Sequence, residues 1–307
     1  MTTALFTHET CVLHEISPGH PEQPARIAAV TDRLKEEQLY DQLILAQAPE
    51  ADLDHLARAH GNSYVDHIVA SSPDKGSVQL DPDTAMNAYS LEASRRAAGA
   101  GVEATRQVLE GEVGNAFCAV RPPGHHAERE RAMGFCFFGS VAVAAYYALE
   151  TKGLDRIAIV DFDVHHGNGT EDLVYQDDRI LFCSSFQHPF YPGYYRDSVA
   201  GSLVNVPLAA GTGSAKFREA ITSKWLPELE RFAPQLVIIS AGFDAHQDDP
   251  LASMELGDDD FEWISREIAG VADKHADGRI VSMLEGGYSL SALGRSAARH
   301  VKVLQEL

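Results

Sequence analysis

Residues 157–170 read Ile-Ala-Ile-Val-Asp-Phe-Asp-Val-His-His-Gly-Asn-Gly-Thr. The segment opens with a continuous apolar run, which is typical of a strand buried on both faces of a parallel sheet. A polar, glycine-rich segment follows that strand directly. In open α/β sheets, ligands bind beyond the carboxyl ends of the strands, so this stretch predicts both an α/β fold and the edge that carries its site.

The same pattern recurs along the chain. Further strands are predicted at 4–7, 116–120, 180–184, 236–241 and 280–284, and the strand above covers 157–162. Amphipathic stretches at 24–38, 90–109, 140–151, 214–231, 259–275 and 291–307 predict helices between them. Strand–helix alternation favours one α/β domain with a parallel sheet and helices on both faces.

Polar segments follow five of the predicted strands. They cover 121–126 (Arg-Pro-Pro-Gly-His-His), 161–169, 184–185 (Ser-Ser), 241–244 (Ala-Gly-Phe-Asp) and 285–288 (Glu-Gly-Gly-Tyr). One such ending is routine, but five at one edge predict an active site. A length of 307 residues allows two domains. A site drawn from residues 121 to 288 instead requires a single domain over residues 1–307.

The charge of the chain restricts its partners. It holds 25 Lys and Arg against 45 Asp and Glu, a formal net charge of −20. This balance argues against a nucleic-acid-binding surface, which needs basic residues to neutralise phosphates, and against binding to anionic membranes. It is compatible with a cationic substrate, and also with an ordinary acidic enzyme.

Targeting signals and cysteine pairing are not expected. The first basic residue is Arg26, and no apolar stretch precedes it. The most apolar segment, 135–149, is shorter than the ~18 to 20 residues that span a bilayer. The wide spacing of the cysteines fits neither a disulfide framework nor a zinc ribbon; they are Cys11, Cys118, Cys136 and Cys183. We therefore expect a cytoplasmic protein.

A metal site is the first candidate chemistry. Asp161, Asp163 and His165 are spaced i, i+2 and i+4, so in an extended chain they share one face. Asp244, at another strand end, could supply a further ligand. Two carboxylates and one imidazole with an open position suit catalytic zinc or ferrous iron. Asp-x-Asp alone favours ordinary turn or capping residues, but His165 and Asp244 shift the balance to a metal.

Acid–base groups are the second candidate chemistry. His125 and His126 follow a stiff Pro-Pro-Gly turn, residues 122–124, and histidine titrates near neutrality as a general base should. The alternative is a hydrated surface pair. Tyr288 follows two glycines, and a phenol beside a metal can donate to a developing oxyanion. The alternative for Tyr288 is a buried core tyrosine.

These motifs, taken together, carry a family likeness. The chain resembles the zinc-dependent histone deacetylase family of the arginase/deacetylase superfamily, in its class II-related bacterial amidohydrolase branch. The motifs are His20-Pro21-Glu22-x-Pro24-x-Arg26, residues 121–127, 134–137 and 161–170, Gln187-His188-Pro189-Phe190-Tyr191-Pro192-Gly193, Asn205-Val206-Pro207, residues 241–244 and 284–288. The resemblance implies a single catalytic domain with a mainly parallel sheet of about eight strands flanked by helices.

The resemblance also implies ligands for two ions. Zinc, with Fe²⁺ as an alternative, would be held by Asp163, His165 and Asp244. A structural potassium ion would be held by Asp161, Asp163, His165, Ser184 and Ser185. The imidazole usual in the family two residues after Ser184 is Phe186 here, so this second site departs from the commoner pattern.

The remaining roles concern catalysis and substrate. His125 and His126 match the catalytic pair, with His126 as general base and acid. Asp161 and Asn168 match the residues that orient the two imidazoles, and Tyr288 matches the transition-state tyrosine. The residues that match the acyl-lysine tunnel and its rim are Gly134, Phe135, Tyr191 and Leu251.

The implied activity is removal of acetyl or other acyl groups from lysine side chains of proteins or peptides, by metal-activated water. An acetylpolyamine amidohydrolase is the alternative enzyme. Some relatives carry Glu at the position of Leu251, so Leu weighs modestly against polyamines, although Asp81, Asp83, Asp248 and Asp249 could supply rim carboxylates. A non-catalytic acyl-lysine binder is disfavoured by the full set of catalytic residues, and an arginase-like enzyme by the absence of a second set of metal ligands. A homo-oligomer is left open.

Overall fold

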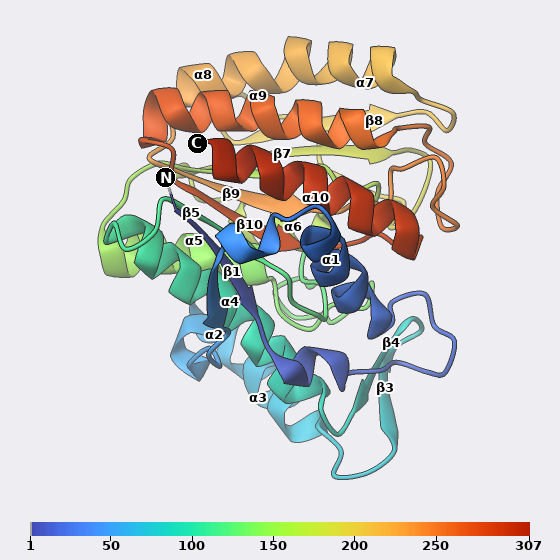
Figure 1. The fold of residues 1–307 in the computed structure, drawn as a ribbon. Helices are drawn as coiled ribbons and strands as arrows, with labels where there is room; N and C mark the ends of the chain where they lie inside the picture. The colour runs from blue at the N-terminus through green and yellow to red at the C-terminus, as the bar shows by residue number, and fades with distance from the viewer. Residues whose placement is uncertain (1) are drawn as a thin grey trace.

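A computed structural model describes residues 2–307. Its centre is an eight-stranded sheet in the order β2-β1-β5-β10-β9-β6-β7-β8, in which every neighbouring pair is parallel (Figure 1). The strands are β1 (Thr3–Thr7), β2 (Ile44–Gln47), β5 (Asn115–Cys118), β6 (Ile157–Asp161), β7 (Ile180–Gln187), β8 (Leu203–Leu208), β9 (Leu236–Ala241) and β10 (Ile280–Leu284). An antiparallel hairpin, β3 (Ser77–Asp81) and β4 (Thr84–Asn87), lies outside the sheet.

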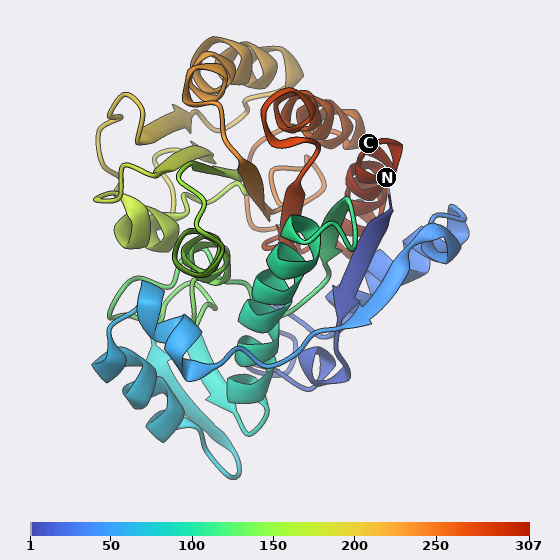
Figure 2. The same cartoon turned by 90° about the vertical axis from the view of Figure 1, so that its left-hand side faces the viewer.

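Helices cover both faces of the sheet (Figures 1 and 2). The α-helices are α1 (Ala25–Glu36), α2 (Leu53–Ala59), α3 (Asn62–Ser71), α4 (Ser90–Leu109), α5 (Ser140–Lys152), α6 (Asn168–Val174), α7 (Ser214–Ala220), α8 (Leu226–Phe232), α9 (Asp258–Ala276) and α10 (Leu290–Glu306). Short turns are η1 (Glu9–Val12), η2 (Tyr40–Gln42) and η3 (Ile221–Trp225). Alternate strand residues face opposite layers: Ile157 and Ile159 pack with α4 and α5, whereas Ala158 and Val160 pack with α9 and α10.

The predicted fold class is confirmed, and the differences have physical causes. β2 was missed because it is a four-residue edge strand with mostly exposed side chains. β8 was missed because Pro207, which cannot donate to a ladder, masked an edge strand. The single helix predicted over 214–231 is interrupted by the π-helical turn η3, which lies just before Pro227 in the first turn of α8.

The five strands with polar endings are neighbours in the sheet. In the order β5-β10-β9-β6-β7 they form an unbroken block. Because they are parallel, all five carboxyl ends meet at one edge. The prediction of a site at that edge follows from this topology.

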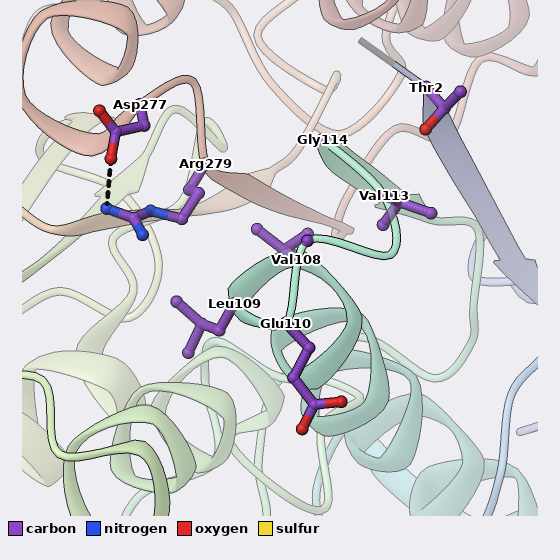
Figure 3. A pocket seen from close by; sticks show the side chains of 9 residues that line it. Thr2, Val108, Leu109, Glu110, Val113, Gly114, Asp277 and Arg279 are labelled. Atoms are coloured by element: carbon purple, nitrogen blue, oxygen red, sulfur yellow. Dashed lines mark hydrogen bonds and ion pairs between the residues drawn. The ribbon is translucent and has the colours of Figure 1, made fainter.

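The opposite edge holds a shallow pocket of about 470 Å³ (Figure 3). Thr2, Gly114 and Arg279, which line it, each come directly before a strand, so the pocket lies at the amino ends. Both chain termini lie near this edge, and Thr3 Oγ1 donates to the carbonyl oxygen of Leu304 at 3.2 Å. Within residues 2–307, no helix is long and apolar enough to cross a membrane.

Candidate active site

Two loops bring together three side chains of the kinds that can bind a metal ion. Asp163 and His165 follow β6, and Asp244 follows β9. His165 Nδ1 lies 3.0 Å from Asp163 Oδ1 and 3.1 Å from Asp244 Oδ2, and all three residues are buried. Within residues 2–307, this is the one cluster of three or more such side chains close enough to share an ion.

The prediction that Asp161, Asp163 and His165 share one face of an extended strand was wrong. β6 ends at Asp161, so Asp163 and His165 do not lie on an extended strand. The chain turns instead: Asp161 Oδ1 accepts from the backbone N–H of Asp163 at 3.1 Å, and Asp163 Oδ1 accepts from that of His165 at 2.9 Å. Aspartate favours such turns because its carboxylate bonds the backbone two residues ahead. The turn chemistry offered as the alternative to a metal site is therefore present in the same residues.

Glycines allow the backbone to close around the carboxylates. A Cβ added at Gly242 would lie 2.0 Å from Asp163 Oδ2, and one added at Gly286 would lie 2.1 Å from Asp244 Oδ2. The N–H of Gly286 also donates to Asp163 Oδ2 at 2.8 Å. The carboxylates of Asp163 and Asp244 are thus held by neighbouring backbone that has no room for a larger residue.

The donor set fits a divalent cation. Burial, together with the negative charge of Asp163, raises the pKa of Asp244, so two adjacent buried carboxylates are unfavourable unless a cation offsets them. Two carboxylate oxygens and one imidazole nitrogen are ligands that zinc and ferrous iron accept. A bound cation would therefore stabilise this arrangement.

The adjacent histidines have different partners. His125 Nδ1 lies 2.9 Å from Asp161 Oδ2, and His126 Nδ1 lies 2.7 Å from Asn168 Oδ1. Their ring centroids are 4.0 Å apart, and both residues are buried. The surface-pair alternative is therefore wrong. With Nδ1 engaged in each ring, Nε2 is the nitrogen left for other contacts.

Their electrostatic environments differ as well. Burial opposes charge on His125, but the carboxylates of Asp163 and Asp161 outweigh it and raise its pKa well above the usual value. Burial and the positive charges of His125 and His165 lower the pKa of His126 well below it. The pKa values of the two neighbouring imidazoles are thus shifted in opposite directions. The protonated form is favoured for His125 and the neutral form for His126.

Tyr288 is buried beside this cluster and makes edge contact with Phe135, their ring centroids 6.2 Å apart. Burial and the charge of Asp244 raise the pKa of its phenol well above the usual value, so the group remains an O–H donor. The Arg26 guanidinium lies 5.1 Å from the ring centre, on its face. Asp249 accepts from the backbone N–H of Tyr288 at 2.7 Å.

Two buried carboxylates of this region were not recognised from the sequence. Glu285 accepts from the backbone N–H groups of Gly124 and His125 at 2.7 and 3.1 Å, and burial raises its pKa to about 7. Asp249, considered only as a rim carboxylate, instead fixes the backbone of Tyr288. An acidic residue directly after an apolar strand, as in Leu284-Glu285, is a signal that could have identified the first of them.

Aromatic rings pack against the histidines of this region. Tyr191 lies edge-on to His126, with centroids 5.1 Å apart. Phe190, which sequence reasoning did not single out, stacks on His165 at 5.3 Å with planes 20° apart. Phe135 is half-buried, and Leu251 lies on the turn held by Asp249, which accepts from its N–H at 3.0 Å.

Gly134 is fixed by contacts that leave no space for a side chain. Its φ is +57°, its N–H donates to Asp83 Oδ1 at 2.9 Å, and an added Cβ would lie 2.3 Å from the His126 ring. We expect Gly134→Ala to displace His126 and to lower kcat about 10²-fold. The matched control is Gly76→Ala, with similar strain at φ +73° but nothing within 4 Å of the new Cβ among the described residues. Equal turnover by the two variants would contradict this expectation.

Part of the set of residues predicted to hold potassium lies on two neighbouring strands. Asp161 and Ser184 are register partners on β6 and β7, and both are buried. Ser184 Oγ lies 3.1 Å from His166 Nδ1, and the His166 ring packs on Phe186 with centroids 4.5 Å apart. The structure thus places part of the set side by side, and the ion remains a prediction.

The parallel sheet and the buried cluster of Asp163, His165 and Asp244 at its edge can be compared with known proteins. A family model described as "Histone deacetylase domain" matches residues 20–304, and the chain therefore belongs to the histone deacetylase family. It is 37% identical to a "Probable deacetylase" of Archaeoglobus fulgidus, over 94% of this chain and 82% of that protein. It is 38% identical to a "Histone deacetylase-like amidohydrolase" of Pseudomonas aeruginosa, with the same coverage.

A solved structure agrees with these sequence matches. The crystal structure of the "HDA15 HD domain" superimposes with a TM-score of 0.93 and 34% identity, over 99% of this chain and 90% of that one. The predicted family and fold are thereby confirmed. Family membership supports hydrolysis of amide bonds by a deacetylase-type enzyme.

Proposed function

We propose that residues 1–307 form a zinc-dependent catalytic domain that removes acetyl groups from lysine side chains of proteins or peptides. The observation that carries this proposal is the buried cluster of Asp163, His165 and Asp244 beside two histidines with different partners. A zinc ion held by these three residues would supply a Lewis acid for the amide carbonyl and a water of lowered pKa.

The side chains of the chain divide the proton transfers. His126, neutral and with Nδ1 engaged by Asn168, takes the proton of the attacking water at Nε2 and returns it to the leaving amine. His125 is paired with Asp161, whose carboxylate favours the cationic imidazole. Tyr288 donates to the substrate carbonyl oxygen as negative charge develops there.

An acyl-lysine side chain suits the residues around the cluster better than an acetylated polyamine does. The rings of Phe135 and Tyr191 would flank the apolar stem of an acyl-lysine, with Gly134 between Phe135 and His126. A polyamine needs free carboxylates for its distal ammonium. Three of the candidates are already engaged: Asp83 by the N–H of Gly134, Asp81 by Arg131 at 2.7 Å and Asp248 by Arg295 at 3.2 Å. The fourth, Asp249, bonds three backbone N–H groups.

A structural potassium ion completes the proposed site. It would be held by residues at and after the end of β6 and by two serines within β7: Asp161, Asp163, His165, Ser184 and Ser185. It would tie the segment at the end of β6 to the neighbouring strand β7.

Removal of the metal tests the proposal. We expect the purified protein to contain about one zinc or iron per chain and to release acetate from an acetyl-lysine peptide faster than from acetylated spermidine. Chelation is expected to abolish release, and added Zn²⁺ or Fe²⁺ to restore it. The same loss is expected for Asp244→Ala but not for Asp248→Ala, an exposed aspartate on the same loop.

Two results would overturn this proposal. Activity that survives complete metal removal would exclude the metal, and a strong preference for the acetylated polyamine would exclude lysine as the favoured substrate. A metal-loaded protein without activity on any acyl amide would instead indicate a binding protein.

A further inference from the structure

The hydrogen bond between His126 and Asn168 can form in two ways. A neutral imidazole and a carboxamide each offer one donor and one acceptor, so Nδ1, 2.7 Å from the Asn168 side chain, can either donate or accept. If it donates, Nε2 keeps its lone pair and can take a proton from water. If it accepts, Nε2 already carries a hydrogen and cannot act as a base. An aspartate here could only accept; an asparagine needs a neighbour that selects its orientation.

Glu128 is placed to make that selection. Its Oε1 lies 2.8 Å from Asn168 Nδ2, and a carboxylate can only accept. The hydroxyl of Tyr194 donates to the same Oε1 at 2.6 Å, so its oxygen is left to accept from Asn168 Nδ2 at 3.2 Å. Both neighbours therefore require the amide NH₂ on their side. This leaves Oδ1 of Asn168 facing His126.

The backbone around Glu128 is held independently of its side chain. The N–H of Glu128 donates to the carbonyl of Arg131 at 2.9 Å, and its own carbonyl lies 3.0 Å from Nδ1 of the buried His60. The carboxylate is thus presented from a fixed loop segment. Changes to the side chain alone leave these contacts in place.

We propose that Glu128 is a positioning residue for the general base, acting through Asn168 to select the His126 tautomer that is protonated at Nδ1. The chain of contacts runs from Tyr194 through Glu128 and Asn168 to His126. This inference rests on the proposed function for its catalytic consequence, while the tautomer itself is a property of the folded protein.

Single substitutions at Glu128 give the first test. Glu128→Gln retains an acceptor for Asn168 and is expected to turn over close to wild type. Glu128→Ala removes the carboxylate acceptor and frees the Tyr194 hydroxyl to donate or to accept, which leaves only the weak acceptor Met133 Sδ, and it is expected to lower kcat about 10–100-fold with little change in KM. Glu130→Ala, an exposed glutamate two residues along the same loop, is the matched control and is expected to leave both constants unchanged.

A double substitution gives a sharper test. Asn168→Asp places a carboxylate 2.8 Å from that of Glu128, and two ionised carboxylates are strongly unfavourable at that distance. We expect that variant to lose turnover. Asn168→Asp combined with Glu128→Gln supplies an amide donor to the new carboxylate, and it is expected to recover kcat about tenfold or more over Asn168→Asp alone. Asn168→Asp combined with Glu130→Gln is expected to recover nothing.

A spectroscopic measurement separates this inference from the proposed function. Long-range ¹H–¹⁵N spectra of the zinc-loaded protein report which ring nitrogen of His126 carries the hydrogen. We expect Nδ1–H in the wild type and a mixture of tautomers in Glu128→Ala, with unchanged melting temperature. A wild-type protein that releases no acetate would defeat the proposed function and leave this measurement decisive. An unchanged tautomer in Glu128→Ala, or a double variant no faster than Asn168→Asp, would overturn the role of Glu128.

Discussion

Tyr288→Phe is expected to lower kcat about 10²–10³-fold, the usual loss when one donor to a developing oxyanion is removed. The change deletes a single oxygen from a ring held on both sides, by Arg26 on its face and Phe135 at its edge. The backbone bond to Asp249 does not involve the hydroxyl. Stability and bound metal should therefore stay at the wild-type level.

Steady-state kinetics and metal analysis on the same preparation check this expectation. Tyr147→Phe, at a buried tyrosine on α5, is the matched control and should turn over normally. Wild-type turnover by Tyr288→Phe would show that the phenol does not stabilise charge in the reaction. Loss of metal from this variant would show that the ring acts on the ligands instead.

His126→Ala is expected to lower kcat about 10²–10⁴-fold, the range of general acid–base catalysis. The ring is removed from a buried site, between Tyr191 and the backbone of Gly134, so the substitution leaves a cavity of about its own size. Added imidazole can enter such a cavity and act as the missing base. Partial recovery with millimolar imidazole therefore distinguishes a lost proton acceptor from a distorted site.

The measurement is turnover with and without imidazole, across a series of imidazole concentrations. His67→Ala, at an exposed histidine on α3, serves as the control. It should keep wild-type turnover both with and without imidazole. Turnover by His126→Ala within tenfold of wild type would contradict the assignment of the base.

The sequence predicted the site best where residues follow strands. Polar endings on five parallel strands had to meet at one edge, so the order of elements alone predicts Asp244 and Tyr288 on the same edge as the histidines. The local backbone geometry was harder to predict from the sequence. The turns around Asp163 depend on backbone hydrogen bonds that no side-chain periodicity reveals.

Contacts between distant segments were harder still to predict. Glu285 and Gly124 are 161 positions apart, and their hydrogen bond exists only because β5 and β10 are neighbours in the sheet. Glu128 is close to Asn168 only once the loop after β5 folds over the start of α6. A single sequence carries the identity of such residues but not their partners.

The adjacency of the two termini has a practical consequence. Thr3 bonds to the carbonyl of Leu304 at the edge of the sheet remote from the Asp163–His165–Asp244 cluster. An immobilising tag on either end would orient the reactive side of the molecule away from its support. A short peptide could also join the two ends. New termini could then be placed in an exposed loop, such as the one around Gly76, to give a circularly permuted chain whose new linker stays outside the core.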